Sequence, residues 1–352
     1  MSDEGALIEI ADESPEALYA LMDTNGWGDG LPIVAPTRSR VARMLAAHPG
    51  SPDEVLAVIP PRSGAATVRT VAVNAVMAGC PPEVMPVVVA AVRAIGRPEF
   101  NLRGVQATTH SVAIMVIVSG AIAVDAGYNA GFGALGPGNR ANATTGRAMR
   151  LLLLNTGGGR PGDGDVSTQG SPAKYTYCFA ENTLASPWPA YPRTRGVEAA
   201  SAVTVAGVEG PHNSHDMWST TPAPVYDKIA SVMTTLGSNN APMGDSEFFV
   251  VLCPEHAALA AQAGWTRRDV QLYLYQNARM PLGLRRKHFE FWGRNIGWLN
   301  ATEDADQLIP MTADPDDIRV VVAGGPGKHS CVIPSWGSIS RSVTLPVGTE
   351  GD

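Results

Sequence analysis

The residues Cys80-Pro81-Pro82 precede an apolar run that starts at Val84, and this combination could support thiol chemistry. Proline suits the first turn of a helix, because the first N–H groups of a helix have no partner within it. We therefore expect Cys80 to lie at a helix N-terminus, where the positive end of the helix dipole lowers the pKa of a thiol. Cys80 is then a candidate catalytic nucleophile or thiol acid/base. The alternative is a buried cysteine that acts as a small apolar side chain.

A glycine- and asparagine-rich segment, residues 127–142, leads into a helix that we expect to begin near Thr144. Free N–H groups at a helix start, together with a planar guanidinium, suit a carboxylate or phosphate. The alternative is an exposed loop in which Gly and Asn occur because they readily adopt a positive φ. No GxxxxGK[ST] segment and no GxGxxG after a first strand indicates a nucleotide cofactor. The predicted substrate-binding residues of this segment are Asn129, Asn139, Arg140 and Asn142.

The cluster His212-x-x-His215-Asp216 follows an expected strand at 202–206 and could hold a divalent metal. Imidazole and carboxylate groups suit Zn, Mn or Fe. The alternative is that these side chains bind loop backbone and cap the next element. We predict no cofactor, and a divalent metal at His212, His215 and Asp216 remains the open alternative.

The segment 324–331 places Lys328, His329 and Cys331 after another expected strand. Residues adjacent in sequence seldom point at one another, so we expect Lys328 and His329 to act on a distant group, such as Cys80 or bound substrate. Histidine is the usual proton-transfer residue near neutral pH. We predict that His110, His212 and His329 transfer protons, and that Lys328 and Glu209 contact the substrate.

The elements that must position these residues alternate between strands and helices. Cap signals predict helices that begin after Ser14, Thr37 and Thr266. Continuous β-branched or apolar runs predict strands at 112–119, 202–206, 248–253 and 318–323. Such alternation indicates an α/β fold with a mostly parallel sheet and flanking helices, in which ligands gather beyond the carboxyl ends of the strands.

We expect two packed α/β subdomains with long glycine-rich loops, because 352 residues exceed the usual size of one domain. Residues 1–200 would form an N-terminal α/β region with the Cys80 helix and the Gly/Asn loop. Residues 201–352 would form a C-terminal, Rossmann-like α/β region.

The composition limits the partners. Charged residues make up 17% of the chain, below the roughly 25% of an average domain, and glycine is abundant at 37 residues, which favours a homo-oligomer. The net charge of -7 argues against a nucleic-acid partner. Four cysteines without a CxxC pair indicate no disulfide framework. No leader and no apolar run of about 18 residues is seen, so we expect a cytoplasmic protein without membrane contact.

Several segments together resemble a bacterial family of largely uncharacterised proteins that is associated with the UGSC-motif (seleno)proteins. The segments that carry the resemblance, which covers nearly the whole chain, are 28–32, 74–83, 136–142, 254–257 with 264–265, and 323–330. The chain has no UGSC or GGSC tetrapeptide, so the redox role of that motif does not carry over. The resemblance implies a small-molecule enzyme with thiol chemistry as an option, and it assigns no catalytic residue.

These features favour an enzyme that cleaves or forms a carbon–heteroatom bond in a small anionic substrate with the help of Cys and His. A lyase, a hydrolase or a thiol-dependent reductase would fit. Two alternatives stay open. One is a metal-dependent hydrolase or hydratase that uses His212, His215 and Asp216. The other is a non-catalytic subunit of an enzyme complex, whose loops bury interfaces.

Overall fold

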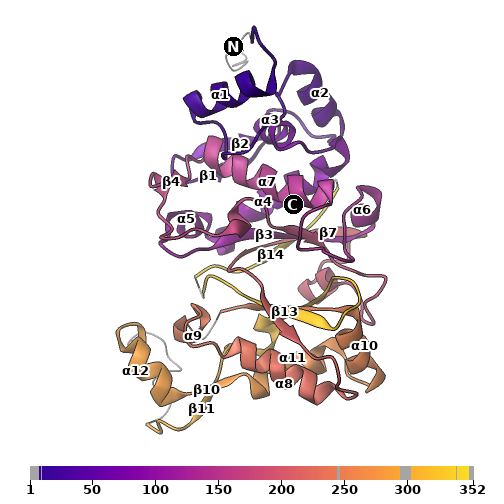
Figure 1. Ribbon diagram of the computed structural model, residues 1–352, viewed down its shortest axis with the longest axis vertical. Coiled ribbons are helices and arrows are strands. Elements are labelled where there is room, and N and C mark those ends of the chain that lie inside the picture. The colour runs from indigo at the N-terminus through magenta and orange to yellow at the C-terminus, as the bar shows by residue number, and fades with distance from the viewer. Residues whose placement is uncertain (1–7, 9, 244–245, 294–302, 338, 349–352) are drawn as a thin grey trace.

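Two four-stranded sheets lie face to face, with helices on their outer sides (Figure 1). The computed structural model describes residue 8 and residues 10–243, 246–293, 303–337 and 339–348. The expectation of mixed helices and strands is confirmed. No helix within these ranges is both long and apolar enough to cross a membrane.

The first sheet has the strand order β14-β7-β3-β6. Its strands are β3 (Ala113–Gly120), β6 (Cys178–Ala180), β7 (Ser201–Val208) and β14 (Val343–Pro346). Strand β3 runs parallel to β6 and antiparallel to β7, and β14 is antiparallel to β7. Helices α4 (Met85–Ile95) and α7 (Arg140–Asn155) pack on this sheet, and α3 (Val68–Ala78) packs on both of these helices.

The second sheet has the strand order β12-β9-β13-β8. Its strands are β8 (His212–His215), β9 (Phe248–Leu252), β12 (Ile318–Val322) and β13 (His329–Pro334). Only the β12–β9 pair is parallel among these described strands. Its helices are α8 (Pro222–Met233), α10 (Pro254–Gln262) and α11 (Arg267–Asn277).

Alternation of side chains along each strand creates the layers, because successive residues point to opposite faces of a sheet. On β3, Met115 and Ile117 are buried against the second sheet, where Phe249 and Ile333 meet them. Val116 of the same strand instead packs into the core beneath the helices. The result is a helix–sheet–sheet–helix sandwich in which both faces of each sheet are apolar.

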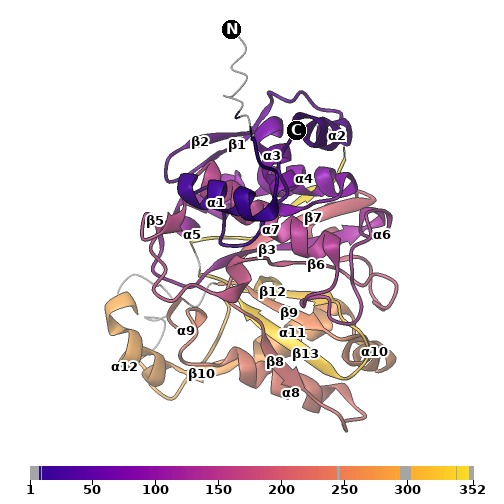
Figure 2. The same ribbon diagram turned by 45° about the horizontal axis from the view of Figure 1, so that its top comes forward.

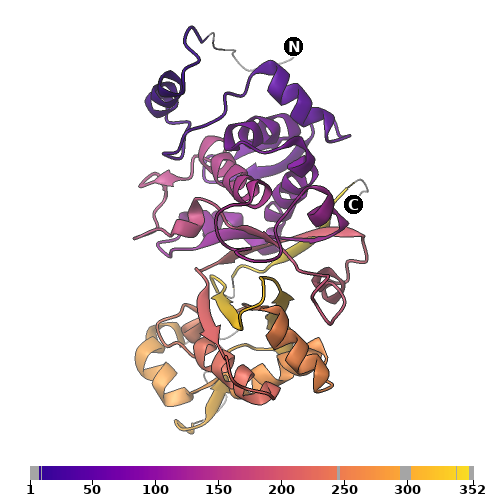
Figure 3. The same cartoon turned by 45° about the vertical axis from the view of Figure 1, so that its right-hand side comes forward.

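Smaller elements surround these layers. In the first half they are α1 (Pro15–Asn25), α2 (Arg38–Ala46), β1 (Val55–Ile59), β2 (Gly64–Thr67), α5 (Leu102–Ala107), α6 (Ala121–Asp125), β4 (Arg160–Pro161) and β5 (Gly164–Asp165). In the second half they are α9 (Asn240–Met243), β10 (Arg279–Pro281), α12 (Leu282–Gly293) and β11 (Leu308–Pro310). Figures 1 and 3 place α1 and α2 at the end of the molecule farthest from the second sheet, and in Figure 2 both lie on the same side of the first sheet as α3 and α4.

The prediction of a mostly parallel sheet is wrong, because both main sheets are mixed. A parallel neighbour needs a long crossover, usually a helix, whereas a short return gives an antiparallel strand. The connection from β12 to β13 spans only residues 323–328, and the described residues of the return from β13 to β14, 335–337 and 339–342, form no helix. The Rossmann-like pattern expected for the second half is therefore not formed.

The second sheet is inserted into the first. The chain leaves after β7, builds the second sheet with its helices, and returns to add β14 beside β7. A backbone bridge pairs Val208 with Ser335, and Trp336 N–H donates to the Gly207 carbonyl at 2.9 Å. The exit and the return therefore lie side by side. Both β7 and β14 fall inside the expected C-terminal region 201–352, yet they belong to the sheet of β3.

The three predicted helix starts are confirmed. Ser14, Thr37 and Thr266 each accept a hydrogen bond from the backbone N–H three residues later. Thr266 and Asp269 form a reciprocal capping box. The helix expected near Thr144 begins earlier, at Arg140, because Asn139 caps it.

A buried ion-pair network joins the two sheets. Arg319 on β12 contacts Glu247, with 2.5 Å between Nη2 and Oε1, and these side chains are 5% and 1% exposed. Glu247 also accepts hydrogen bonds from Ser342 N (2.7 Å) and Oγ (2.9 Å), just before β14. A second carboxylate, Asp316, binds both Arg319 (3.1 Å) and Arg195 (2.7 Å). The network therefore ties the inserted unit to the returning strand.

Candidate functional site

A groove of about 790 Å³ lies between α7 and the segment 160–175. Its charged lining residues are Asp29, Arg150, Arg160, Asp165 and Lys174. Arg150 projects from α7, Asp165 ends the short strand β5, and Lys174 ends the 3-10 helix Pro172–Lys174. Three separate elements therefore deliver their charges to one place.

A tight turn brings β5 toward α7. Gly164 has a φ of 98°, which side-chain-bearing residues rarely adopt, and a Cβ there would lie 2.7 Å from the Gly158 carbonyl oxygen. Glycine at this position therefore lets Asp165, the next residue, turn inward.

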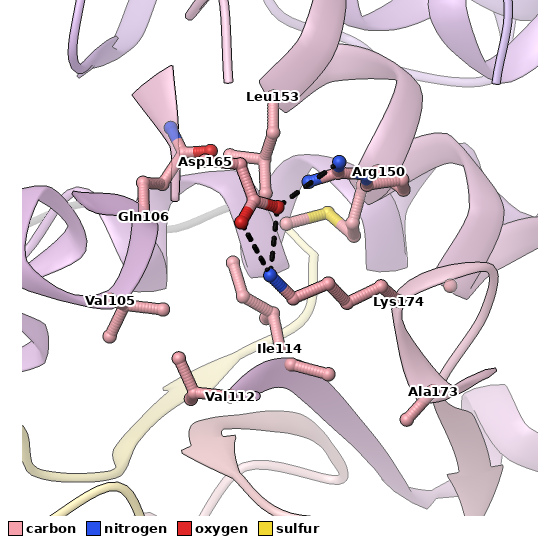
Figure 4. A pocket seen from close by; sticks show the side chains of 12 residues that line it. Val105, Gln106, Val112, Ile114, Arg150, Leu153, Asp165, Ala173 and Lys174 are labelled. Atoms are coloured by element: carbon pink, nitrogen blue, oxygen red, sulfur yellow. Dashed lines mark hydrogen bonds and ion pairs between the residues drawn. The ribbon is translucent and has the colours of Figure 1, made fainter. Parts of the chain in front are cut away.

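Asp165, which lines the groove, is shared by two cations (Figure 4). Lys174 Nζ lies 2.8 Å from Oδ1 and 2.7 Å from Oδ2, and Arg150 Nη2 lies 3.3 Å from Oδ2. The side chains of Asp165, Arg150 and Lys174 are only 6%, 14% and 15% exposed. Two mostly buried cations share one carboxylate, so one positive charge has no counterion among these three residues.

Burial lowers the pKa of the Lys174 ammonium below its usual range. Asp165 opposes this shift through its hydrogen bonds and charge, and the neighbouring charge of Arg150 adds to it. Burial also lowers the pKa of Arg150, but a guanidinium stays protonated in proteins. Lys174 is therefore the cation of this pair that can exchange a proton.

The other charged lining residues of the groove are Asp29 and Arg160. Arg147 Nε and Nη2 hold the carboxylate of Asp29 in a bidentate contact at 2.7 and 2.8 Å, which fastens the loop after α1 to α7. Arg160 packs against Gly26, where a Cβ would lie 2.5 Å from Nη1. Within the described ranges, no hydrogen bond or ion pair to the Arg160 guanidinium is found. Its charge is thus left for a ligand or for solvent.

A small cavity of about 30 Å³ opens behind the groove. Arg150, Asp165 and Lys174 line both spaces. Apolar side chains that line the cavity include Val105, Val112, Ile114, Met149 and Leu153, most of them labelled in Figure 4. The charged residues therefore stand between a polar groove and an apolar cavity.

The structure brings the predicted residues His110 and Glu209 together, with 3.1 Å between Nε2 and Oε1. His110 precedes β3 and Glu209 follows β7, and the antiparallel register pairs Ala113 with Val208. Ser167 Oγ donates to the His110 carbonyl at 2.7 Å, and Ser167 lines the groove. The pair therefore lies beside the groove wall.

Cys80 does not lie at a helix N-terminus. It follows Gly79, which ends α3 with a φ of 86°, and the next 3-10 helix begins at Pro82. Burial raises the pKa of the Cys80 thiol to about 12, and the thiol donates to the Thr144 carbonyl at 3.3 Å. The expected lowering of its pKa is wrong, because the thiol is enclosed and next to the negative end of α3.

We expect folded protein to resist alkylation at Cys80. With a pKa of about 12, only about one thiol in ten thousand is ionised at pH 8. Iodoacetamide at pH 8, followed by peptide mass spectrometry, should label Cys80 only after unfolding in guanidinium. Burial also raises the pKa of Cys178, Cys253 and Cys331, so they should behave alike. Rapid labelling of Cys80 in the folded state would contradict this.

The predicted anion-binding residues of the segment 127–142 hold the loop itself. Asn142 is buried, accepts from Asn129 N at 2.9 Å, and donates to the carbonyls of Asn129 and Ala134. Asn139 caps α7, and Arg140 Nε donates to the Gly79 carbonyl at 2.9 Å. These contacts fasten the loop to α7 and α3. Neither Cys80 nor Arg140 lines the groove.

The predicted metal residues lie on strand β8 and its end rather than in a loop. His212 and His215 are three positions apart, so they project to opposite faces of the strand. Asp216 is buried and accepts hydrogen bonds from Lys228, Ser219 and the Trp218 N–H. Although burial opposes ionisation, these bonds hold the pKa of Asp216 well below its usual range. In the part of the chain that the structure describes, no group of three or more His, Cys, Asp or Glu is arranged around a metal position.

The predicted residues of the segment 324–331 also find local partners. His329 stacks on His215 with 5.5 Å between ring centroids, and its Nδ1 lies 2.9 Å from Asn213 Oδ1. Lys328 Nζ donates to the Met217 carbonyl at 2.9 Å. The His329 side chain therefore joins β13 to β8 at the edge of the second sheet and does not contact Cys80.

Arg150, Asp165 and Lys174 were not predicted from the sequence. Asp165 falls in a polar loop and Arg150 within an amphipathic helix, where charged residues are ordinarily solvated. One signal in the sequence could have pointed to Lys174: lysine is rare in this chain, with only four in 352 residues.

A scan of protein-family models and a search of curated proteins found no match to this chain. Its class is thus defined by the fold and the site alone, as an α/β protein with two facing mixed sheets and a cationic groove.

Proposed function

We propose that the protein is an enzyme that binds a small anionic substrate in the groove and cleaves or forms a carbon–heteroatom bond in it. Lys174, Arg150 and Arg160 bind the anion, and the Lys174 ammonium also transfers the proton. The observation that supports this most directly is that two mostly buried cations share the single carboxylate of Asp165.

The charge balance favours an anionic ligand. Among the described residues that line the groove, the carboxylates are Asp29 and Asp165, and Arg147 already holds Asp29. Arg150, Arg160 and Lys174 then face the one remaining carboxylate. This local excess of positive charge stands within a chain of net charge -7, so it is a feature of the groove and not of the whole surface.

Proton transfer by Lys174 agrees with its surroundings. A general acid works best when its pKa lies near the working pH, and burial moves the pKa of Lys174 in that direction, so the ammonium that binds the anion can also donate a proton. His110 with Glu209, beside the groove wall, offers a second acid/base pair. We give Cys80 no role, because its enclosed thiol is protonated near neutral pH.

The test is an isothermal titration of inorganic phosphate and of succinate. Replacing Lys174 with Met should weaken binding about ten- to a hundredfold, the cost of one charge-assisted contact. The matched control is Lys287→Met, on the exposed face of α12. In the unaltered protein, affinity should fall as the pH rises through the pKa of Lys174, which burial lowers from the usual value of a lysine, since the ammonium then loses its charge.

Equal affinities of both variants and the unaltered protein would contradict anion binding at Lys174. If binding is retained but no carboxylic acid or phosphate ester is turned over, the non-catalytic subunit becomes the better proposal.

We further propose a homo-oligomer without nucleic-acid partners and in the cytoplasm. The oligomer is supported by the low charged fraction and by three large exposed apolar side chains, those of Phe132, Leu184 and Trp218.

A further inference from the structure

The cavity behind the groove has the size of a short alkyl group. One water molecule needs about 10–15 Å³ by this measure, so about 30 Å³ admits two groups of that size. Its wall is formed largely by Val105, Val112, Ile114, Met149 and Leu153. A space with such a wall favours carbon over water, because apolar surface gains free energy when it leaves water.

The position of the cavity links it to the anion site. Arg150, Asp165 and Lys174 line the groove on one side and the cavity on the other. An anion held by Arg150 and Lys174 would therefore carry its next carbon atoms to the mouth of the cavity. A carboxylate is the anion that can do this directly, since its charged group continues into a carbon chain.

We propose that the substrate is a short aliphatic carboxylate that carries a heteroatom substituent. Its carboxylate binds Lys174 and Arg150, its ethyl-sized part fills this cavity, and the substituent, whose bond to carbon reacts, stays on the groove side. This inference rests on the proposed function. The apolar residues of the cavity wall then determine chain-length specificity, with Val105 and Ala173 as the positions that a small substitution can enlarge or fill.

The experiment is a ligand-observed NMR titration with acetate, propionate, butyrate and hexanoate. Propionate should bind about fourfold more tightly than acetate, the gain for one buried methylene group. Hexanoate should bind at least about fivefold more weakly than propionate, because the cavity cannot accept the longer chain without strain.

Two variants test the wall in opposite directions. Val105→Ala enlarges the cavity and should move the preference to butyrate, whereas Ala173→Val fills it and should remove the advantage of propionate over acetate. Val250→Ala makes the same change as the first variant in the helix-facing core of the second sheet. This control should keep the original order.

The outcomes separate the two proposals. If no carboxylate binds and phosphate also fails, the proposed function is wrong. If all four carboxylates bind with equal affinity, or if Val105→Ala leaves the order unchanged, anion binding stands and the chain-length inference is overturned.

Discussion

Replacing Asp165 with Asn is expected to lower the free energy of unfolding by about 3 kcal/mol. The carboxylate is shared by Lys174 and Arg150, whose side chains are mostly buried, so the substitution leaves two cations without their counterion. We take the lower end of the range for a broken buried pair, because both cations keep some contact with solvent. Urea unfolding followed by circular dichroism measures the change.

The control is Asp163→Asn, two residues away. Asp163 pairs with Arg62 on the surface, at side-chain exposures of 72% and 62%, so its loss should cost less than about 1 kcal/mol. Added phosphate should recover more stability in Asp165→Asn than in the unaltered protein, because it replaces the missing negative charge. Equal losses in both variants, with no recovery by phosphate, would show that Asp165 is not the counterion of this site.

Replacing Arg319 with Met is expected to lower the free energy of unfolding by about 3–5 kcal/mol. Glu247 would then be buried without a cation, although Ser342 still donates two hydrogen bonds to it. Guanidinium is unsuitable for this measurement because its salt screens charges, so urea unfolding is preferred.

An exposed pair provides the comparison. Arg193 lies 3.5 Å from Glu198 at the surface, and Arg193→Met should change stability by less than about 1 kcal/mol. Adding Glu247→Gln to Arg319→Met should recover much of the loss, because the buried charge is removed along with its partner. A single Arg319→Met variant that unfolds at the same urea concentration as the unaltered protein would refute this account.

Local signals in the sequence predicted elements well and their pairing poorly. The caps at Ser14, Thr37 and Thr266 act within one helical turn, so neighbouring residues suffice to predict them. The direction of β7 beside β3 depends on how residues 181–200 return across the sheet, and no local pattern encodes that return.

The candidate site also depends on pairing and packing that local sequence patterns do not encode. His110 and Glu209 were candidates for separate reasons, and only the antiparallel β3–β7 register makes them neighbours. Cys80 was misjudged because Gly79 ends one helix where a proline pair suggested the start of another. Asp165 and Lys174 were missed because their burial results from the way the loop after α7 folds back against that helix, which no local pattern encodes.

The insertion of the second sheet has a consequence for synthesis on the ribosome. Residues 212–334 are contiguous, so this unit can form its sheet as soon as they emerge, whereas β7 keeps an unpaired edge until β14 has been made. An open strand edge readily pairs with other chains. The nascent protein therefore passes through a stage in which the second sheet is folded while β7 of the first sheet still has an unpaired edge that can aggregate. At that stage chaperones would have the most to protect.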